Sequence, residues 1–191
     1  PTSSYAQAAA YAMGRAMDDV IIAAATGTAY TGETGTGTES AQTAIAASVG
    51  LTTGLNIPKL AKAKETFDLS DVDPSIARHI IVSPEQINNL LNVTEVTSSD
   101  FNTVKALVQG EIDTFLGFKF TVSNRLAKSG NDRTCIAFAQ DGITLGVGKD
   151  VSARIDERAD KSYATQVYYC MSIGATRMEQ AKVIGITCTE A

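Results

Sequence analysis

The sequence predicts an α+β fold, in which helices and strands are mixed without a regular βαβ repeat. Ala-rich and capped helical segments occupy much of the first half of the chain, and residues 134–188 alternate as strands do. The chain has 191 residues, of which 44% are hydrophobic and 19% are charged. A chain of this length buries roughly 70% of its unfolded surface, so it can build a core without disulfides or metals.

The first predicted helix spans residues 4–25, where alanine, the strongest helix former, recurs throughout. Ser3 or Ser4 can cap its N-terminus, and Gly27 can end it. Small residues form a narrow stripe along one side, so a neighbouring backbone can come close. The stripe consists of Tyr5, Ala9, Ala12, Ala16 and Val20. The Gly- and Thr-rich stretch 27–43 that follows predicts an exposed hairpin or loop.

Two further helices are marked by capping residues on either side of a short buried strand at residues 78–83. Asn56 can cap the first of them, with Pro58 near its first helical position. Ser83 and Gln86 have the spacing of a capping box for the second. Each helix has an apolar face. These faces consist of Leu60, Ala63 and Phe67 in the first helix and of Ile87, Leu90 and Leu91 in the second.

The clearest two-residue alternation in the chain lies in GEIDTFLGFKFTVSNRL, from Glu111 to Ser123. It predicts one half-buried strand, preceded by a helix from Ser99 or Asp100 to Gly110. Phe115 is the exception to the alternation. We expect this strand to organise the core around it. The residues expected on its buried face are Ile112, Leu116, Phe118, Phe120 and Val122.

The remainder of the chain is predicted to be mostly β. After the polar turn AKSGNDR, the segments TCIAFAQ, GITLGVG and VSARID read as short strands. YATQVYYCMSIGATRM reads as a long strand, and KVIGITC ends the series. A charged stretch of mixed sign, residues 149–161, lies in this region. It is either a solvated strand edge or a complementary contact with a neighbouring copy of the chain.

The composition argues against several classes of function. The net charge is −5, and no stripe of Lys and Arg follows a predicted helix, so the basic face of a nucleic-acid-binding protein is missing. Cys135, Cys170 and Cys188 are widely spaced and lie in no Cys/His pattern. They favour buried free thiols in a reducing compartment over a zinc site. The apolar runs are too short to span a bilayer, and no secretion-signal pattern is visible.

Catalytic and cofactor-binding patterns are also weak. GETGTGT, residues 32–38, lacks the terminal Gly-Lys-Ser/Thr of a phosphate loop. His79 is the only histidine and no GxSxG motif occurs, so a packed strand histidine is favoured over a catalytic base. The acid pairs at 18–19, 71 and 73, and 156–157 read as capping or solvated groups. We therefore expect no enzyme, no cofactor and no metal site.

The order of these blocks resembles the major capsid proteins of tailed bacteriophages with the HK97-type fold. The family's order of strands and helices is matched by RHIIVSPEQINNLLN followed by SSDFNTVKALVQGEIDTFLGFKFTVSNRL. There, a strand ending in VSP precedes a helix, and a helix ending in Gly precedes a strand with an acidic start. YAQAAAYAMGRAMDDVIIAAATGTA resembles the spine helix of the family, and the segment from Gly142 to Cys188 resembles its terminal strands.

The resemblance implies a long spine helix, a peripheral domain and an axial domain. It places residues 1–50 and about 150–180 in the peripheral domain, with the spine helix at 4–25. It places residues 51–149 in the axial domain and leaves 181–191 unassigned. The N-terminal arm and extended loop that precede the spine helix in this family are expected to be absent from this chain.

The function implied by the resemblance is self-assembly into an icosahedral shell around double-stranded phage DNA. The shell is expected to be the virion capsid, assembled in the host cytoplasm. Many copies in pentamers and hexamers would be the main partners, together with a scaffold, a portal and decoration proteins. DNA contact is expected to be weak and non-specific because the chain is acidic, and no membrane is expected to take part. The Lys–Asn cross-link of some relatives is not expected, because the last asparagine is Asn131.

Contacts between subunits are expected at the loop near Gly32 to Gly37 and in the charged stretch. The candidate residues are Gly32, Gly35, Gly37, Lys149, Arg154, Asp156, Glu157 and Arg158. Three alternatives stay open. The first is an encapsulin-like cellular compartment, which shares the fold, and the second is a small hydrolase that uses His79. The third is a decoration or adhesin module that remains a small oligomer.

Overall fold

The computed structural model describes residues 4–33, 37–39, 43–50, 54–92 and 114–190. Three α-helices and eleven strands are assigned within these ranges, with two short 3₁₀ turns, Ala159–Lys161 and Gln180–Lys182. The helices are α1 (Ser4–Thr26), α2 (Ile57–Leu69) and α3 (Pro84–Leu91). The strands are β1 (Ala29–Thr31), β2 (Gly37–Glu39), β3 (Thr43–Ile45), β4 (Arg78–Val82), β5 (Thr114–Phe115), β6 (Phe118–Val122), β7 (Lys128–Ser129), β8 (Asp132–Ala139), β9 (Ile143–Arg158), β10 (Ala164–Arg177) and β11 (Val183–Thr189).

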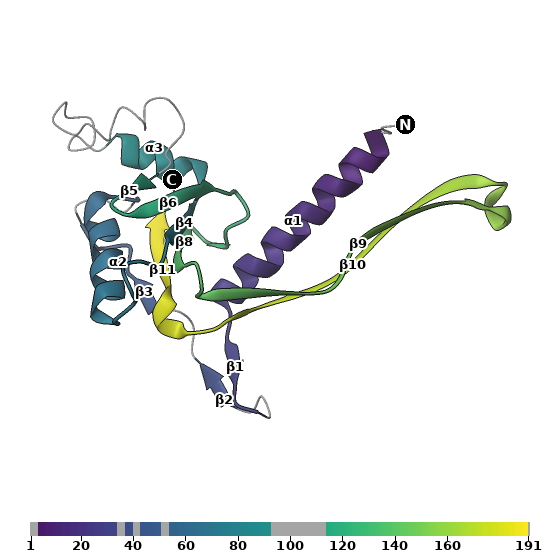
Figure 1. Ribbon diagram of the computed structural model, residues 1–191. Coiled ribbons are helices and arrows are strands. Elements are labelled where there is room, and N and C mark those ends of the chain that lie inside the picture. Colours follow the sequence, from purple (N-terminus) through teal and green to yellow (C-terminus); the bar gives the residue numbers. More distant parts are fainter. Residues whose placement is uncertain (1–3, 34–36, 40–42, 51–53, 93–113, 191) are drawn as a thin grey trace.

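A mixed sheet forms the body of the molecule, which confirms the α+β class. Its strand order is β3-β11-β8-β4-β6-β5, and β7 pairs with β8. β4 with β6 and β11 with β3 are parallel, whereas β8 is antiparallel to both of its long neighbours. The segment at 181–191, which the sequence left unassigned, therefore supplies β11, a strand inside this sheet. Figure 1 shows the sheet with α2 and α3 beside it.

The two helices of the body begin where the sequence predicts. The Asn56 side chain accepts a hydrogen bond from the Lys59 backbone N–H at 2.9 Å, and Pro58 lies in the first turn of α2. Ser83 caps α3 by accepting from the Gln86 N–H at 3.4 Å. The apolar faces are buried as predicted, because Leu60, Ala63, Phe67 and Leu90 are fully buried and Ile87 and Leu91 pack against the same core.

The prediction of one strand from Glu111 to Ser123 is wrong in the described part. The chain reverses at Leu116 and Gly117, whose φ angles are +52° and +85°. β5 and β6 therefore form a hairpin in which Phe115 lies opposite Phe118. A turn of two residues with positive φ is typical of tight hairpins. The alternation continues through the turn, so the sequence pattern conceals the reversal.

The hairpin changes which side chains are buried. Phe118 and Phe120 are buried as expected, but so is Phe115, the supposed exception. Leu116 is 36% exposed in the turn and Val122 is 56% exposed, so neither belongs to the core as expected. Ile112 and the helix expected up to Gly110 lie outside the described residues.

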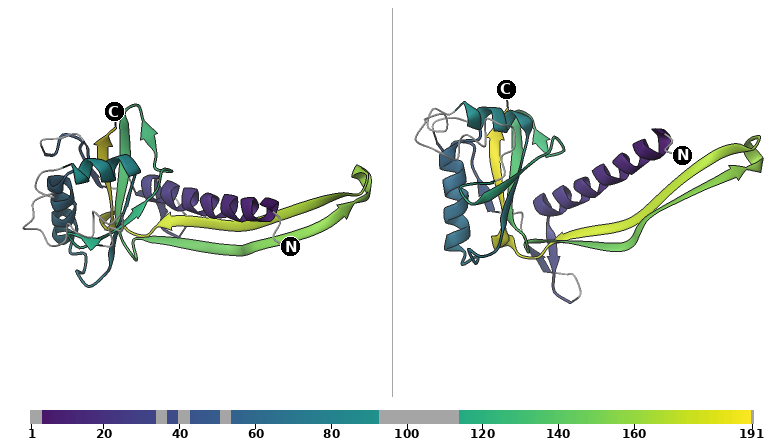
Figure 2. Two further views of the ribbon diagram at one scale, coloured as in Figure 1. Left: turned by 90° about the horizontal axis from the view of Figure 1, so that it is seen from above. Right: turned by 45° about the horizontal axis from the view of Figure 1, so that its top comes forward.

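The segments GITLGVG and VSARID, expected as two strands, form the single strand β9, which pairs with β10 as an antiparallel two-stranded ribbon. The pairing passes from Val147 opposite Ile173 to Ser152 opposite Cys170, so β9 has two more residues than β10 over this interval. Such bulges bend a ribbon and let a strand continue through residues that resemble a turn. The ribbon projects far from the sheet, and we call it the arm (Figures 1 and 2).

The N-terminal segment also follows its prediction. α1 covers the expected helix at 4–25 and ends at Thr26, where the Gly27 N–H donates to the Ala23 carbonyl at 2.8 Å. Of the expected stripe, Ala9, Ala16 and Val20 are half-buried, whereas Ala12 is exposed. β1 and β2 then form the expected hairpin. None of the helices in the described residues combines the length and apolar character that crossing a bilayer requires.

Candidate assembly surfaces

α1 supports the inner part of the arm. The Tyr169 hydroxyl of β10 donates to the Ala6 carbonyl at 3.5 Å, near the start of the helix. Arg177, the last residue of β10, donates to the carbonyls of Ala25 and Gly27 at 3.1 and 2.9 Å, near the end of the helix. The helix therefore runs in the same direction as the part of β10 from Tyr169 to Arg177 and over a matching length. Arg177 is buried and places its positive charge at the negative end of the helix dipole, where cations are stabilising.

The outer part of the arm, residues 154–168, extends beyond this support (Figure 1). All of its residues are exposed. Ile155 lies opposite Val167, on the face of the ribbon that carries Tyr169 nearer the body. Ile155 is 66% exposed, and Val167 and Tyr168 are also among the exposed large hydrophobic residues. An isolated two-stranded ribbon is marginally stable in water, so this outer arm is suited to packing against another surface.

The predicted charged residues divide between the two faces of the outer arm. Arg154, Asp156 and Arg158 alternate with Ile155 and Glu157, so the first three share one face. Charges of alternating sign therefore follow one face, while Glu157 accompanies Ile155 on the other. Arg158 also pairs with Asp160 at the tip. This pair raises the pKa of Arg158 and lowers that of Asp160 through their hydrogen bond.

Lys149 lies apart from those charges, beside the bulge. Its Nζ is 3.1 Å from Cys170 Sγ on the opposite strand, and Ser152 Oγ is 2.9 Å from the same sulfur. These hydrogen bonds, from Ser152 first and then Lys149, lower the pKa of Cys170. Cys170 is half-buried, unlike the fully buried thiols that the sequence predicted, although Cys135 and Cys188 are buried as expected.

The predicted glycine loop is a separate surface. Gly32 has φ +85° in the turn after β1 and has open space around it. Gly37 begins β2, and Gly35 lies outside the described residues. The structure therefore does not bring this loop together with the outer arm into one site, because β1 and β2 leave the molecule on a different side (Figure 1).

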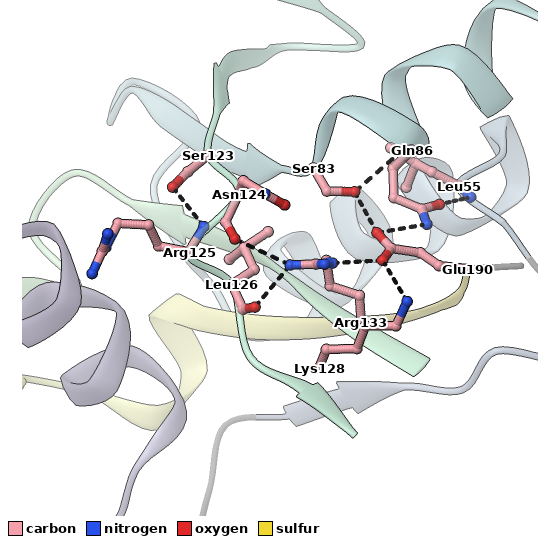
Figure 3. A network of polar contacts seen from close by, with 10 residues as sticks. All are labelled: Leu55, Ser83, Gln86, Ser123, Asn124, Arg125, Leu126, Lys128, Arg133 and Glu190. Atoms are coloured by element: carbon pink, nitrogen blue, oxygen red, sulfur yellow. Dashed lines mark hydrogen bonds and ion pairs between the residues drawn. The ribbon is translucent and has the colours of Figure 1, made fainter. Parts of the chain in front are cut away.

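A buried carboxylate joins segments that are distant in sequence, as Figure 3 shows. Glu190 follows β11 and is 2% exposed. One oxygen accepts from Arg133 Nε at 2.7 Å and lies 3.3 Å from Lys128 Nζ. The other accepts from the Ser83 hydroxyl at 2.6 Å and from Gln86 Nε2 at 3.5 Å. The network therefore ties the end of the last strand to the cap of α3 and to the β7–β8 hairpin.

The same network extends to two backbone segments. Gln86 Oε1 accepts from the Leu55 N–H at 2.8 Å, so the glutamine of the predicted capping box serves a tertiary contact. Arg133 Nη1 donates to the carbonyls of Asn124 and Leu126 at 3.3 and 3.0 Å. No local sequence pattern marks Glu190 or Arg133, because their partners come from segments that are distant in sequence.

The pKa of Glu190 shows how the network holds its charge. Burial alone would raise this pKa, but hydrogen bonds from Arg133, Ser83, Lys128 and Gln86 lower it from 4.5 to about 2. A carboxyl group whose pKa is lowered on folding stabilises the fold above its unfolded value. That stabilisation is therefore complete above pH 4.5 and is lost as the pH falls from 4.5 towards 2.

We expect Glu190→Gln to lower the free energy of unfolding at pH 7 by up to roughly 3 kcal/mol, the value that the pKa difference corresponds to. Urea unfolding of the subunit at pH 7, 5 and 3 checks this, because the deficit should shrink as the pH falls. Glu179→Gln is the matched control, since Glu179 is an exposed partner of Lys182. An equal deficit at pH 7 and pH 3 would contradict the charge-based explanation.

The residues considered for catalysis have structural contacts. The His79 ring stacks on Phe138 with centroids 5.5 Å apart, as a cross-strand neighbour of β4 and β8. The prediction of a packed histidine is confirmed. Asp19 of α1 pairs with Arg125, which joins the helix to the loop after β6. Asp73 accepts from the Ser75 N–H at 2.8 Å, as a turn residue does.

A sequence model of phage capsid proteins matches residues 1–190. The chain belongs to the phage capsid protein family. Among curated proteins, none matches the chain at a significant level.

Solved structures show the fold of this capsid-family chain. A structure from Mycobacterium phage Che8 matches with a TM-score of 0.72 and 17% identity, over 97% of this chain and 63% of that one. The capsid of cyanophage P-SCSP1u matches with a TM-score of 0.70 and 18% identity, over 100% and 67%. The capsid of an empty GTA particle matches with a TM-score of 0.69 and 11% identity, over 97% and 65%. The chain thus spans 63% to 67% of these chains. The expected HK97-type fold is confirmed.

Proposed function

We propose that the chain is the structural major capsid protein of a phage, whose copies assemble as pentamers and hexamers into an icosahedral shell around double-stranded DNA. The observation that carries this proposal, beyond family membership, is the arm. Its outer part exposes Ile155, Val167 and Tyr168 together with charges of both signs. Exposed apolar residues surrounded by charges are typical of a surface that another chain covers. Repetition of such a contact around symmetry axes closes a shell.

The division into domains is part of the proposal. Residues 1–50 and the arm form the peripheral domain, and residues 51–142, shortened from 51–149, form most of the axial domain. The arm supports moving the second peripheral segment from about 150–180 to Ile143–Arg177, the bounds of β9 and β10. The pairing of β11 with β8 supports placing 181–191 in the axial domain. β3 then links the two domains through its pairing with β11.

Further partners follow from the role of a shell subunit. A scaffold and a portal would direct closure, and decoration proteins would bind the outer surface. The packaged DNA would meet the chain only through weak, non-specific proximity, because the net charge of −5 disfavours binding of polyanions. We place assembly in the host cytoplasm and expect no role for a membrane.

A structural role is favoured over the hydrolase alternative. His79 is held against Phe138 within the sheet, and among the described residues its ring has no hydrogen bond to a nucleophilic side chain. A general base needs a proton to abstract within hydrogen-bond reach. The family match likewise favours a viral shell over a cellular compartment.

The test is negative-stain electron microscopy of protein expressed from the complete reading frame and separated by size-exclusion chromatography. We expect closed shells, tubes or capsomer rings. Co-expression with a scaffold is the second arm of the experiment, since some shells need one to close. A monomer under both conditions would contradict the proposal.

A further inference from the structure

Two buried thiols lie together in the body of the molecule. Cys135 of β8 is opposite Ile186 of β11, two residues before Cys188, so both cysteines face the same side of neighbouring antiparallel strands. The two thiols share a hydrogen bond. Both residues are fully buried, and neither is in a disulfide.

A buried lysine accompanies this pair. Lys59 of α2 is fully buried, its Nζ lies 4.0 Å from Cys188 Sγ, and it donates to the Gly54 carbonyl at 2.8 Å. The hydrogen bond from Cys135, with the charge of Lys59 in support, lowers the pKa of Cys188. The same hydrogen bond and burial raise the pKa of Cys135. Cys188 is therefore the thiol disposed to ionise, and a nearby cation is what activates a nucleophilic thiol.

We propose that Cys135 and Cys188 form a redox site that a low-molecular-weight disulfide converts into an intrachain disulfide. The Cys188 thiolate attacks one sulfur of the oxidant, forms a mixed disulfide and releases one thiolate. Cys135 then loses its proton and attacks Cys188 Sγ, which forms the protein disulfide and releases the second thiolate. The protein gives up two hydrogens, and the oxidant becomes two thiols.

The position of the bond gives it a mechanical consequence. β8 precedes the arm and β11 follows it, so the disulfide would join the two strands from which the arm leaves the sheet. It would close a long loop that contains the whole arm, and closing long loops stabilises a fold most in the chain-entropy account. The chemistry is independent of the proposed function. The time at which the disulfide would form does rest on the proposed function, since a shell that leaves a reducing cell would be oxidised after assembly.

The test uses the full chain with Cys170→Ser, which removes the half-buried third thiol. The reduced protein is incubated with excess oxidised glutathione for hours, because opening of the sheet precedes attack on a buried sulfur. We expect both remaining thiols to disappear together, a mass lower by two hydrogens, and a proteolytic peptide pair that links Cys135 to Cys188. The Tm should rise by roughly 5 to 15 °C and return on reduction.

Two variants assign the roles. Cys135→Ser, in the same background, should retain glutathione on Cys188 because the resolving thiol is gone. Lys59→Met keeps a long buried side chain but removes the charge, and it should slow oxidation roughly threefold, because the thiolate fraction of Cys188 falls. The proposal is overturned if glutathione adds separately to both cysteines. It is equally overturned if both stay reduced while Cys170 in the unmodified chain is glutathionylated.

Discussion

Phe120→Asp should prevent the subunit from folding. Phe120 is 8% exposed on β6 and belongs to the same core as Phe118 and Phe67. The change removes a large aromatic ring from that core and buries a carboxylate there without a partner. The two effects together should cost about 5 kcal/mol or more, which is comparable with the whole net stability of a typical domain. Expression with far-UV circular dichroism of any soluble fraction checks the result.

Val122→Asp is the matched control for this prediction. Val122 lies two residues further along β6, with its side chain on the same face, but it is 56% exposed. Its replacement should cost about 1 kcal/mol or less and leave soluble, folded protein. The pair of variants thus separates the cost of burying a carboxylate from the cost of placing aspartate in a strand. Equal behaviour of the two variants would contradict the difference in burial between Phe120 and Val122.

Much of the body could be predicted from the sequence because its signals are local. A cap such as Asn56 or Ser83 acts within one helical turn, so a short window of sequence contains all the information needed to place the helix start. The same holds for the apolar face of α2 and for the alternation in β4. The order of these blocks then indicated the fold, which the solved capsid structures confirm.

The wrong predictions concern segments whose sequence pattern is compatible with two different backbone structures. The alternation around Leu116 and Gly117 is compatible with a straight strand, and a leucine at positive φ is uncommon enough to hide the turn. Phe115, which broke the pattern, was the signal of the reversal. In β9, the glycines and the charged stretch resemble a turn, but β10 holds them in one strand through a bulge.

The polar network around Glu190 could not be predicted from the sequence, and the reason is a different one. Glu190 obtains its partners from the α3 cap and from the β7–β8 hairpin, and only the completed sheet brings these together. Arg177 is similar, since its acceptors at Ala25 and Gly27 are far away in sequence. A charged residue that follows an apolar strand gives no local sign of whether it will be buried or solvated.

Ile155→Asp should abolish shell assembly and leave the subunit folded. Ile155 is 66% exposed in the outer arm, so its replacement removes no core contact within one subunit. In an assembled contact it would place a charge in an apolar interface, where central residues often contribute 2 kcal/mol or more. Because every copy carries the change, the loss is repeated across the shell. Size-exclusion chromatography and electron microscopy of the particles measure assembly, and thermal unfolding of the subunit measures the fold.

Leu69→Asp is the control, because Leu69 is 74% exposed at the end of α2, away from the arm, and the chemical change is similar. It should assemble normally, whereas normal assembly of Ile155→Asp would exclude the outer arm as a contact.

Salt then distinguishes the two interpretations of the arm's charges. If Arg154, Asp156 and Arg158 pair with a neighbouring copy, the protein concentration needed for assembly should rise with ionic strength, because salt screens exposed charges. If they are only solvated, that concentration should be insensitive to salt, and the apolar residues alone would hold the contact.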